Sequence, residues 1–251
     1  MAFGAEEHVY TGTRVDQAEF DAGLRAHMLR VYNYMVCGLL LTGILAVVVA
    51  QFSVVTNDAG QIVGLTSLGQ TLFGSPLKWV VMLAPLGLVF FLSARLHKMS
   101  YSTAQTTFWV YAALMGISLA TIFMAFTGAS VARVFFITAG TFAGMSLWAY
   151  TTKKDLSGWG SFLFMGLIGI IIAMIVNIFI GSSALQFAIS VIGVLVFVGL
   201  TAYDTQNIKN EYAEHYDEET QGKLAISGAL RLYLDFINLF IMLLHLFGNR
   251  E

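Results

Sequence analysis

The chain has 251 residues, of which 57% are hydrophobic and only 11% are charged, and its formal net charge is −2. Soluble domains carry roughly 25% charged residues, so this composition, with a mean hydropathy of +0.75, indicates an integral membrane protein. The small negative charge gives no reason to expect a nucleic-acid partner. A single cysteine, Cys37, excludes an internal disulfide.

A polar stretch opens the chain. We predict that residues 1–28 form a cytoplasmic tail and that residues 29–251 form one transmembrane domain. The first apolar run begins too late, and is too long, for a cleaved secretory signal, so we interpret it as a retained span.

Seven apolar runs follow, each long enough to cross a lipid bilayer, which takes about 20 residues. They cover residues 31–52, 77–96, 107–127, 132–151, 161–181, 184–206 and 224–247. The last is the weakest candidate, because polar residues interrupt it, and it either crosses fully or dips in and returns. We predict an all-α integral membrane protein with seven transmembrane helices.

Positive charges divide unevenly between the two ends of these runs. One side carries nine, namely Arg14, Arg25, Arg30, Arg95, Lys98, Lys153, Lys154, Lys209 and Lys223, and the other carries Lys78, Arg133 and Arg250. The positive-inside rule therefore predicts a cytoplasmic N-terminus and, with seven crossings, a C-terminus outside.

The last apolar run carries a stripe of polar residues. Ser227, Arg231, Asp235 and Asn238 recur at intervals of three or four residues, which places them on one helical face. Such a face must meet protein or water and not lipid. We therefore expect the last helix to lie at the centre of the bundle.

Asp204 and Asp235 are the residues that most need an explanation. An ionised acid in the hydrocarbon region costs roughly 2.5–3.5 kcal/mol on insertion scales, so these two must pair, take up a proton or serve a function. Thr201 shares the helical face of Asp204. The two acids can meet only if the sixth helix continues beyond residue 206, and residues 207–212 contain no helix breaker.

Two carboxyl groups in contact cannot both ionise cheaply, so the pair would share a proton and titrate as a unit. Such a pair is a pH-sensitive element that links two helices. Carboxylate oxygens are also ligands that Ca²⁺ prefers. In the alternative interpretation the acids are only neutralised, Asp235 by Arg231 and Asp204 by Arg95, because buried ion pairs can be merely tolerated.

Other polar residues in the spans are candidates to line a pore. They are Thr201, Ser227, Asn238 and Asn177, although Asn177 can equally serve as a hydrogen-bond partner for a neighbouring helix. No HExxH, GxSxG, CxxC or P-loop motif is present, so we expect no enzyme and no cofactor. An intramembrane aspartyl protease is only half matched, by Tyr203-Asp204.

Three stretches resemble the Bax inhibitor-1 family, whose bacterial branch includes small seven-helix proteins. Residues 199–209 (GLTAYDTQNIK) resemble its signature, residues 150–157 (YTTKKDLS) resemble the loop after the fourth span, and residues 166–179 resemble the fifth span. The resemblance covers nearly all of the chain from about residue 25.

The resemblance implies a last helix that lies in the middle of the bundle and a pH-sensitive passive calcium leak in the bacterial inner membrane. Asp204 and Asp235 would be the pH sensor and gate, and the site that calcium passes. Arg95 and Arg231 would tune the pair. Some relatives are instead described as regulators of membrane proteases or of cell death, so a non-transporting regulator that binds a membrane protease is the alternative.

Overall fold

The computed structural model describes residues 6–57 and 62–249, with side chains from residue 20 onward. Within that part of the chain, seven helices are long and apolar enough to cross a membrane, which confirms the predicted all-α transmembrane fold. They are α1 (Glu6–Ser53), α3 (Leu77–Arg95), α4 (Tyr101–Ala125), α5 (Gly128–Thr151), α6 (Gly160–Ile180), α7 (Ser183–Glu211) and α8 (Glu218–Phe247). Two single 3₁₀ turns, η2 (Leu96–Lys98) and η3 (Ser157–Trp159), precede α4 and α6.

Short polar turns define where the spans begin. The hydroxyls of Ser100, Thr127 and Ser182 each accept a hydrogen bond from the backbone N–H three residues on, at the starts of α4, α5 and α7. Hydroxyl caps of this kind satisfy the free N–H groups of a helix start. Gly181 ends α6 with a φ of 66°, the left-handed conformation that glycine adopts without strain.

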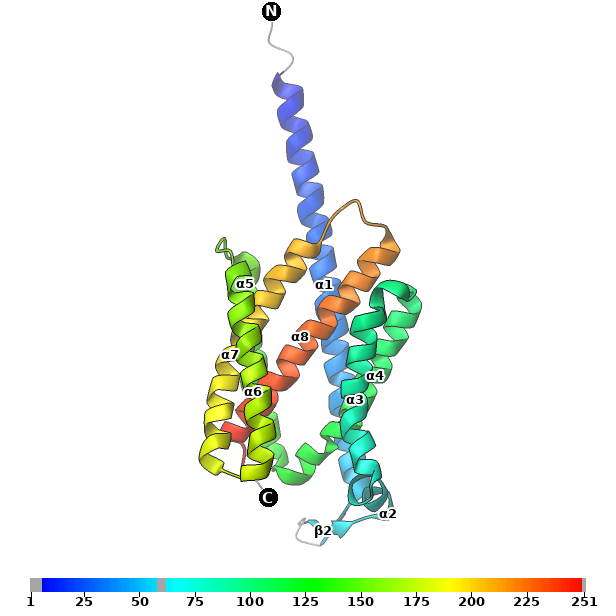
Figure 1. Cartoon of the computed structure of the whole chain (residues 1–251). Helices are drawn as coiled ribbons and strands as arrows, with labels where there is room; N and C mark the ends of the chain where they lie inside the picture. Colours follow the sequence, from blue (N-terminus) through cyan, green and yellow to red (C-terminus); the bar gives the residue numbers. More distant parts are fainter. Residues whose placement is uncertain (1–5, 58–61, 250–251) are drawn as a thin grey trace, which may run out of the picture.

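A small structured segment joins α1 to α3 at the end of the bundle opposite the N-terminus (Figure 1). Strands β1 (Val54–Thr56) and β2 (Ile62–Leu65) pair antiparallel and are followed by a helical turn, α2 (Ser67–Gly69), and a π-helical turn, η1 (Gln70–Gly74).

Helix α8 lies in the middle of the bundle and crosses it obliquely (Figure 1). It packs against α1, α4, α5 and α7. Its first turns meet the start of α4, where Gly222 lies against the Tyr101 ring. Just beyond its other end, the Asn249 backbone N–H donates to the Ser130 hydroxyl at 2.8 Å, near the start of α5. Since α8 runs from one end of α4 to the other, it crosses the full depth of the bundle.

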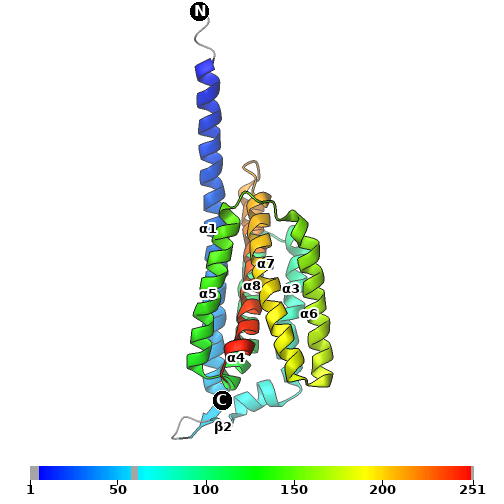
Figure 2. The same ribbon diagram turned by 90° about the vertical axis from the view of Figure 1, so that its left-hand side faces the viewer.

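The first helix is longer than the apolar run that it contains. Helix α1 is continuous from Glu6 to Ser53 and extends well beyond the other helices at its N-terminal end (Figures 1 and 2). Most of the tail predicted for residues 1–28 therefore belongs to the same helix as the first span, and residues 1–5 lie outside the described residues.

Polar contacts hold three of the helices together at mid-depth. The hydroxyl of Thr42 on α1 donates to the carbonyl oxygen of Ala112 on α4 at 2.8 Å. The same hydroxyl lies 2.7 Å from the Tyr233 hydroxyl on α8. Because the Thr42 proton is used on Ala112, Tyr233 must be the donor to Thr42.

Candidate functional site

The two acids selected from the sequence lie together between α7 and α8. Helix α7 continues to Glu211, as their meeting required. The carboxyl groups of Asp204 and Asp235 lie within hydrogen-bonding reach of each other. Among the described residues, no donor reaches the buried Oδ2 atom of Asp235. A hydrogen bond between two carboxyl groups requires a proton on one of them, so this contact favours a pair that shares one proton.

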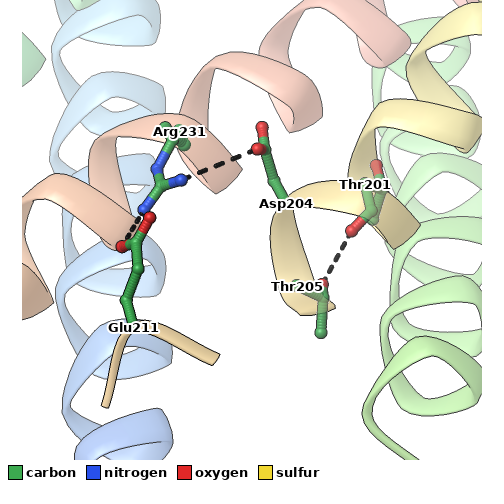
Figure 3. A network of polar contacts seen from close by, with 5 residues as sticks. All are labelled: Thr201, Asp204, Thr205, Glu211 and Arg231. Carbon is green, nitrogen blue, oxygen red and sulfur yellow. Dashed lines mark hydrogen bonds and ion pairs between the residues drawn. The ribbon is translucent and has the colours of Figure 1, made fainter. Parts of the chain in front are cut away.

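Arg231 joins this pair to a third acid. Its Nη1 atom lies 3.9 Å from Asp204 Oδ1, and its Nη2 atom donates to Glu211 Oε2 (Figure 3). One guanidinium therefore bridges Asp204 and Glu211, which stand two helical turns apart on α7. We call Arg231 and Glu211 the latch, because their bond closes α8 against the end of α7.

Exposure decreases along this row of charges. The side chains of Glu211, Arg231 and Asp204 are 39%, 28% and 15% exposed. Asp235, the deepest, is 5% exposed as a residue. The row thus leads from the edge of the bundle into its core, and a buried acid at its end is costly unless it is paired or protonated.

A cleft of about 400 Å³ opens at the latch. It lies between the α3–η2 end of the second span and the face of α8, and its walls are Leu92, Ser93, Leu96, His97, Glu211, Leu224, Ile226, Ser227, Leu230, Arg231 and Leu234. The cleft reaches both residues of the latch, whereas Asp235 is buried and is not among its lining residues.

Three of the predicted pore residues lie on α7 and α8 near the pair. Ser227 lines the cleft. Asn238 is half-buried about one turn beyond Asp235, and its amide donates to the Leu234 carbonyl oxygen at 2.8 Å. Thr201 is fully buried, and its hydroxyl donates to Phe197 O at 2.8 Å, so its polar group is already satisfied within α7.

Two predicted residues lie elsewhere. Arg95 is exposed at the end of α3, and among the described residues it makes no ion pair with Asp204, whose cation is Arg231. Asn177 lies where α6 turns into α7. Its amide donates to Gln186 Oε1 at 3.2 Å and its oxygen accepts from Ser182 N at 3.0 Å. It is therefore a helix-connecting residue, the alternative that the sequence had left open, and not part of a path to the acid pair.

Sequence reasoning did not select Glu211. A signal for it existed, because Glu211 follows Asp204 by seven residues and so shares its face once α7 is known to continue. What the sequence did not reveal is that Arg231 reaches Glu211 in addition to Asp204.

Calcium can meet only a small number of oxygen ligands here. Across residues 6–57 and 62–249, no group of three or more His, Cys, Asp or Glu side chains is arranged to hold a metal ion. A resident calcium ion takes 6–8 oxygen ligands. Asp204 and Asp235 alone therefore offer fewer ligands than a resident calcium ion takes.

Comparison with known proteins gives matches over most of the chain. The family model described as "Inhibitor of apoptosis-promoting Bax1" matches residues 24–251. The inner membrane protein YbhL of Escherichia coli is 48% identical over 232 residues, which are 92% of this chain and 94% of that protein. The protein RP147 of Rickettsia prowazekii is 46% identical over 232 residues, 92% of this chain and 93% of its own length. A Caulobacter vibrioides protein is 45% identical over 238 residues and covers 92% of both chains.

Proposed function

The chain belongs to the Bax inhibitor-1 family, and on that premise we propose that it is a pH-sensitive passive calcium leak of the bacterial inner membrane. Asp204 and Asp235 form its gate. The observation that carries this proposal is the contact between two carboxyl groups buried between α7 and α8. The inner-membrane location follows the relative YbhL, and the positive charges favour a cytoplasmic N-terminus.

The gate is closed when the two carboxyl groups share a proton. The pair then carries one negative charge, and Arg231 lies beside it, 3.9 Å from Asp204. With a positive charge beside the singly charged pair, α8 stays packed against α7 and fills the centre of the bundle. The latch between Arg231 and Glu211 reinforces the same arrangement from the cleft side.

Loss of the shared proton opens the gate. Two negative charges would then be in contact at a buried position, where like charges repel strongly. Separation of α7 from α8 relieves the repulsion and exposes carboxylate oxygens that attract Ca²⁺. Both consequences act in the same direction, so the leak rises as pH rises.

Acidification does not open the gate by releasing Arg231. Protonation of Asp204 removes one partner of Arg231, but Glu211 still holds the other terminal nitrogen of the guanidinium. Arg231 therefore stays at the inner end of the cleft, and the closed arrangement persists at low pH.

Calcium is the substrate of this leak and is not retained. Two carboxylates offer enough attraction to bring the ion in and too few ligands to hold it, which is the balance that conduction requires. Arg231 must move away from Asp204 before the ion can pass, because a guanidinium and Ca²⁺ compete for the same oxygens.

Purified protein in liposomes that contain a calcium indicator tests this function. We expect a calcium flux that increases between pH 6 and pH 8, and Asp204→Asn and Asp235→Asn should each flatten that pH response. Asp155→Asn is the matched control, because Asp155 lies in the exposed loop between α5 and α6. Flux absent at every pH, with both variants silent, would contradict the proposal and favour a non-transporting regulator of a membrane protease.

A further inference from the structure

A long apolar groove runs along the bundle between α1 and α5, away from the acid pair. It consists of two cavities of about 570 and 520 Å³. Both cavities are lined by Leu39, Leu40, Phe135 and Phe236, so they adjoin. Helices α1 and α5 run side by side as its walls (Figure 2), and α8 supplies its floor through Phe236, Ile237 and Phe240.

The groove opens sideways, where a bilayer surrounds the bundle. Several of its lining residues are large, apolar and exposed, among them Leu29, Val36, Leu40 and Leu147. Water in such a groove would lack hydrogen-bond partners over most of its length. A hydrocarbon occupant is therefore the stable one.

One end of the groove is polar and basic. Arg25 lines this end, is exposed, and makes no ion pair with another side chain in the described part of the chain. Tyr150, on the opposite wall, has the Lys209 ammonium 5.3 Å from its ring centre. Among the described residues that line the two cavities, Arg25 is the only charged one, and Lys209 adds a second positive charge beside the lining residue Tyr150. Positive charge therefore gathers at one end of the groove.

Hydroxyl groups lie just below this basic end. The Tyr32 hydroxyl on α1 lies 2.5 Å from the Ser146 hydroxyl on α5, and Ser146 lies 2.9 Å from Thr205 on α7. Tyr32 and Ser146 both line the groove. Moving inward from Arg25, a ligand would meet a cation, then hydroxyls, then hydrocarbon.

From this order of cation, hydroxyl groups and hydrocarbon along the groove, we propose that the α1–α5 groove binds one anionic phospholipid from the leaflet at the Arg25 end. Its phosphate pairs with Arg25, its ester groups meet the hydroxyls of Tyr32 and Ser146, and an acyl chain fills the groove along Leu39, Phe135 and Phe236. The proposal does not depend on the calcium leak.

The dimensions of the groove favour an acyl chain over a partner helix. A transmembrane helix is about 10 Å across and 30 Å long, with a volume on the order of 2,000 Å³. A helix could cover cavities of 570 and 520 Å³ but could not enter them. Volumes of this size are typical of small-molecule sites, which run from about 300 to 1,000 Å³.

Native mass spectrometry of the full chain in detergent, with added phosphatidylglycerol or phosphatidylcholine, tests the site. We expect one phosphatidylglycerol per chain to be retained in preference to phosphatidylcholine. Ala143→Trp on α5 and Leu40→Trp on α1 fill the groove from opposite walls, and each should abolish retention. Ile172→Trp, on the exposed face of α6, is the control and should leave retention unchanged.

A charge variant separates the headgroup from the chain. Arg25→Gln should reduce the preference for phosphatidylglycerol by about fivefold, the effect expected for one basic residue near a lipid surface, while one phospholipid is still retained. Lys98→Gln, which does not line the groove, should keep the full preference. Retention that both groove-filling variants leave intact, or a preference that Arg25→Gln leaves intact, would overturn the proposal. The proposal is also overturned if the groove-filling variants abolish a dimer that cross-linking detects in the wild type and leave lipid retention unchanged, because that result assigns the groove to a second copy.

Discussion

The guanidinium of Arg231 contacts two acids of α7 at once, Asp204 at 3.9 Å and Glu211 through a hydrogen bond (Figure 3). The two acids differ in depth, and Arg231 is the only residue on α8 that the described ion pairs connect to α7. A change at the exposed acid should therefore be felt at the buried pair.

Glu211→Gln should raise the basal leak in liposomes severalfold at pH 6. The substitution keeps the shape of the side chain but removes the charge that holds Arg231, and a partly exposed ion pair of this kind is worth about 1 kcal/mol or less. Glu214→Gln is the control, since Glu214 lies three residues further along, exposed and outside the latch. An unchanged leak in Glu211→Gln, or an equal rise in Glu214→Gln, would remove the latch from the proposed mechanism.

Two glycines should respond in opposite ways to alanine. At Gly116 an added Cβ would lie 2.7 Å from the Thr42 carbonyl oxygen and 2.9 Å from Leu45 Cβ, where α4 meets α1. Gly116→Ala should destabilise the bundle by about 1–3 kcal/mol, as overpacking does. At Gly87 on α3 a Cβ meets nothing within 4 Å. Gly87→Ala should be neutral or stabilise by up to about 1 kcal/mol.

The midpoint of unfolding of the purified protein in detergent measures the stability change in each glycine variant. Equal midpoints for the two glycine variants would contradict the close approach of α4 to α1.

Two buried tyrosines on neighbouring helices provide a second matched pair. Tyr233 donates to Thr42 at 2.7 Å, so Tyr233→Phe should cost about 1 kcal/mol, the usual net value of one hydrogen bond. The Tyr111 hydroxyl is buried and has no hydrogen-bond partner among the described residues. Tyr111→Phe removes an unsatisfied polar group and should leave stability unchanged or raise it. The same unfolding measurement in detergent compares the two variants. A larger loss of stability in Tyr111→Phe than in Tyr233→Phe would contradict these hydrogen-bond assignments.

Asp155, in the loop between α5 and α6, gives a pH-dependent prediction outside the membrane. Ser157 hydrogen-bonds this carboxylate through its hydroxyl and through its backbone N–H at 2.9 Å, and these bonds lower the pKa of Asp155. A lowered pKa means that the ionised form is the one favoured by folding, so the stabilisation is present at neutral pH and is lost as pH falls through that pKa.

Ser157→Ala should therefore raise the pKa of Asp155 part of the way to its usual value, because the backbone N–H remains. Carboxyl chemical shifts followed during an acid titration measure it. A pKa equal in the wild type and in Ser157→Ala would show that the hydroxyl contributes nothing.

Hydropathy and spacing predicted much of this molecule. The seven apolar runs were long enough to require seven helices, and the boundaries agree to within a few residues at most ends, as at α7, where the Ser182 hydroxyl caps the helix just before the apolar run. The polar stripe on the last run indicated its central place correctly. The contact of Asp204 with Asp235 followed from helix continuation through residues 207–211.

The errors have physical causes too. Hydropathy gives the depth of a residue in the bilayer but not its direction around the bundle, so it could not show that the cation beside Asp204 is Arg231 and not Arg95. For Asn177 the sequence left two interpretations open, and the fold shows the hydrogen bond to a neighbouring helix, with Gln186 of α7 as the partner. Strands β1 and β2 have three and four residues, too few for an alternating pattern to be recognised in the sequence.

The position of α8 has a consequence for biogenesis. A ribosome delivers the helices in order, so α1 to α7 enter the membrane before the segment that fills the space between them. Until residues 218–247 arrive, the acid on α7 has no α8 acid to share a proton with, and apolar faces of α1, α4, α5 and α7 lie against lipid or one another. Insertion of α8 is then the step that commits the nascent protein to its final architecture, and a nascent chain that stalls before that helix is a natural target for membrane quality control.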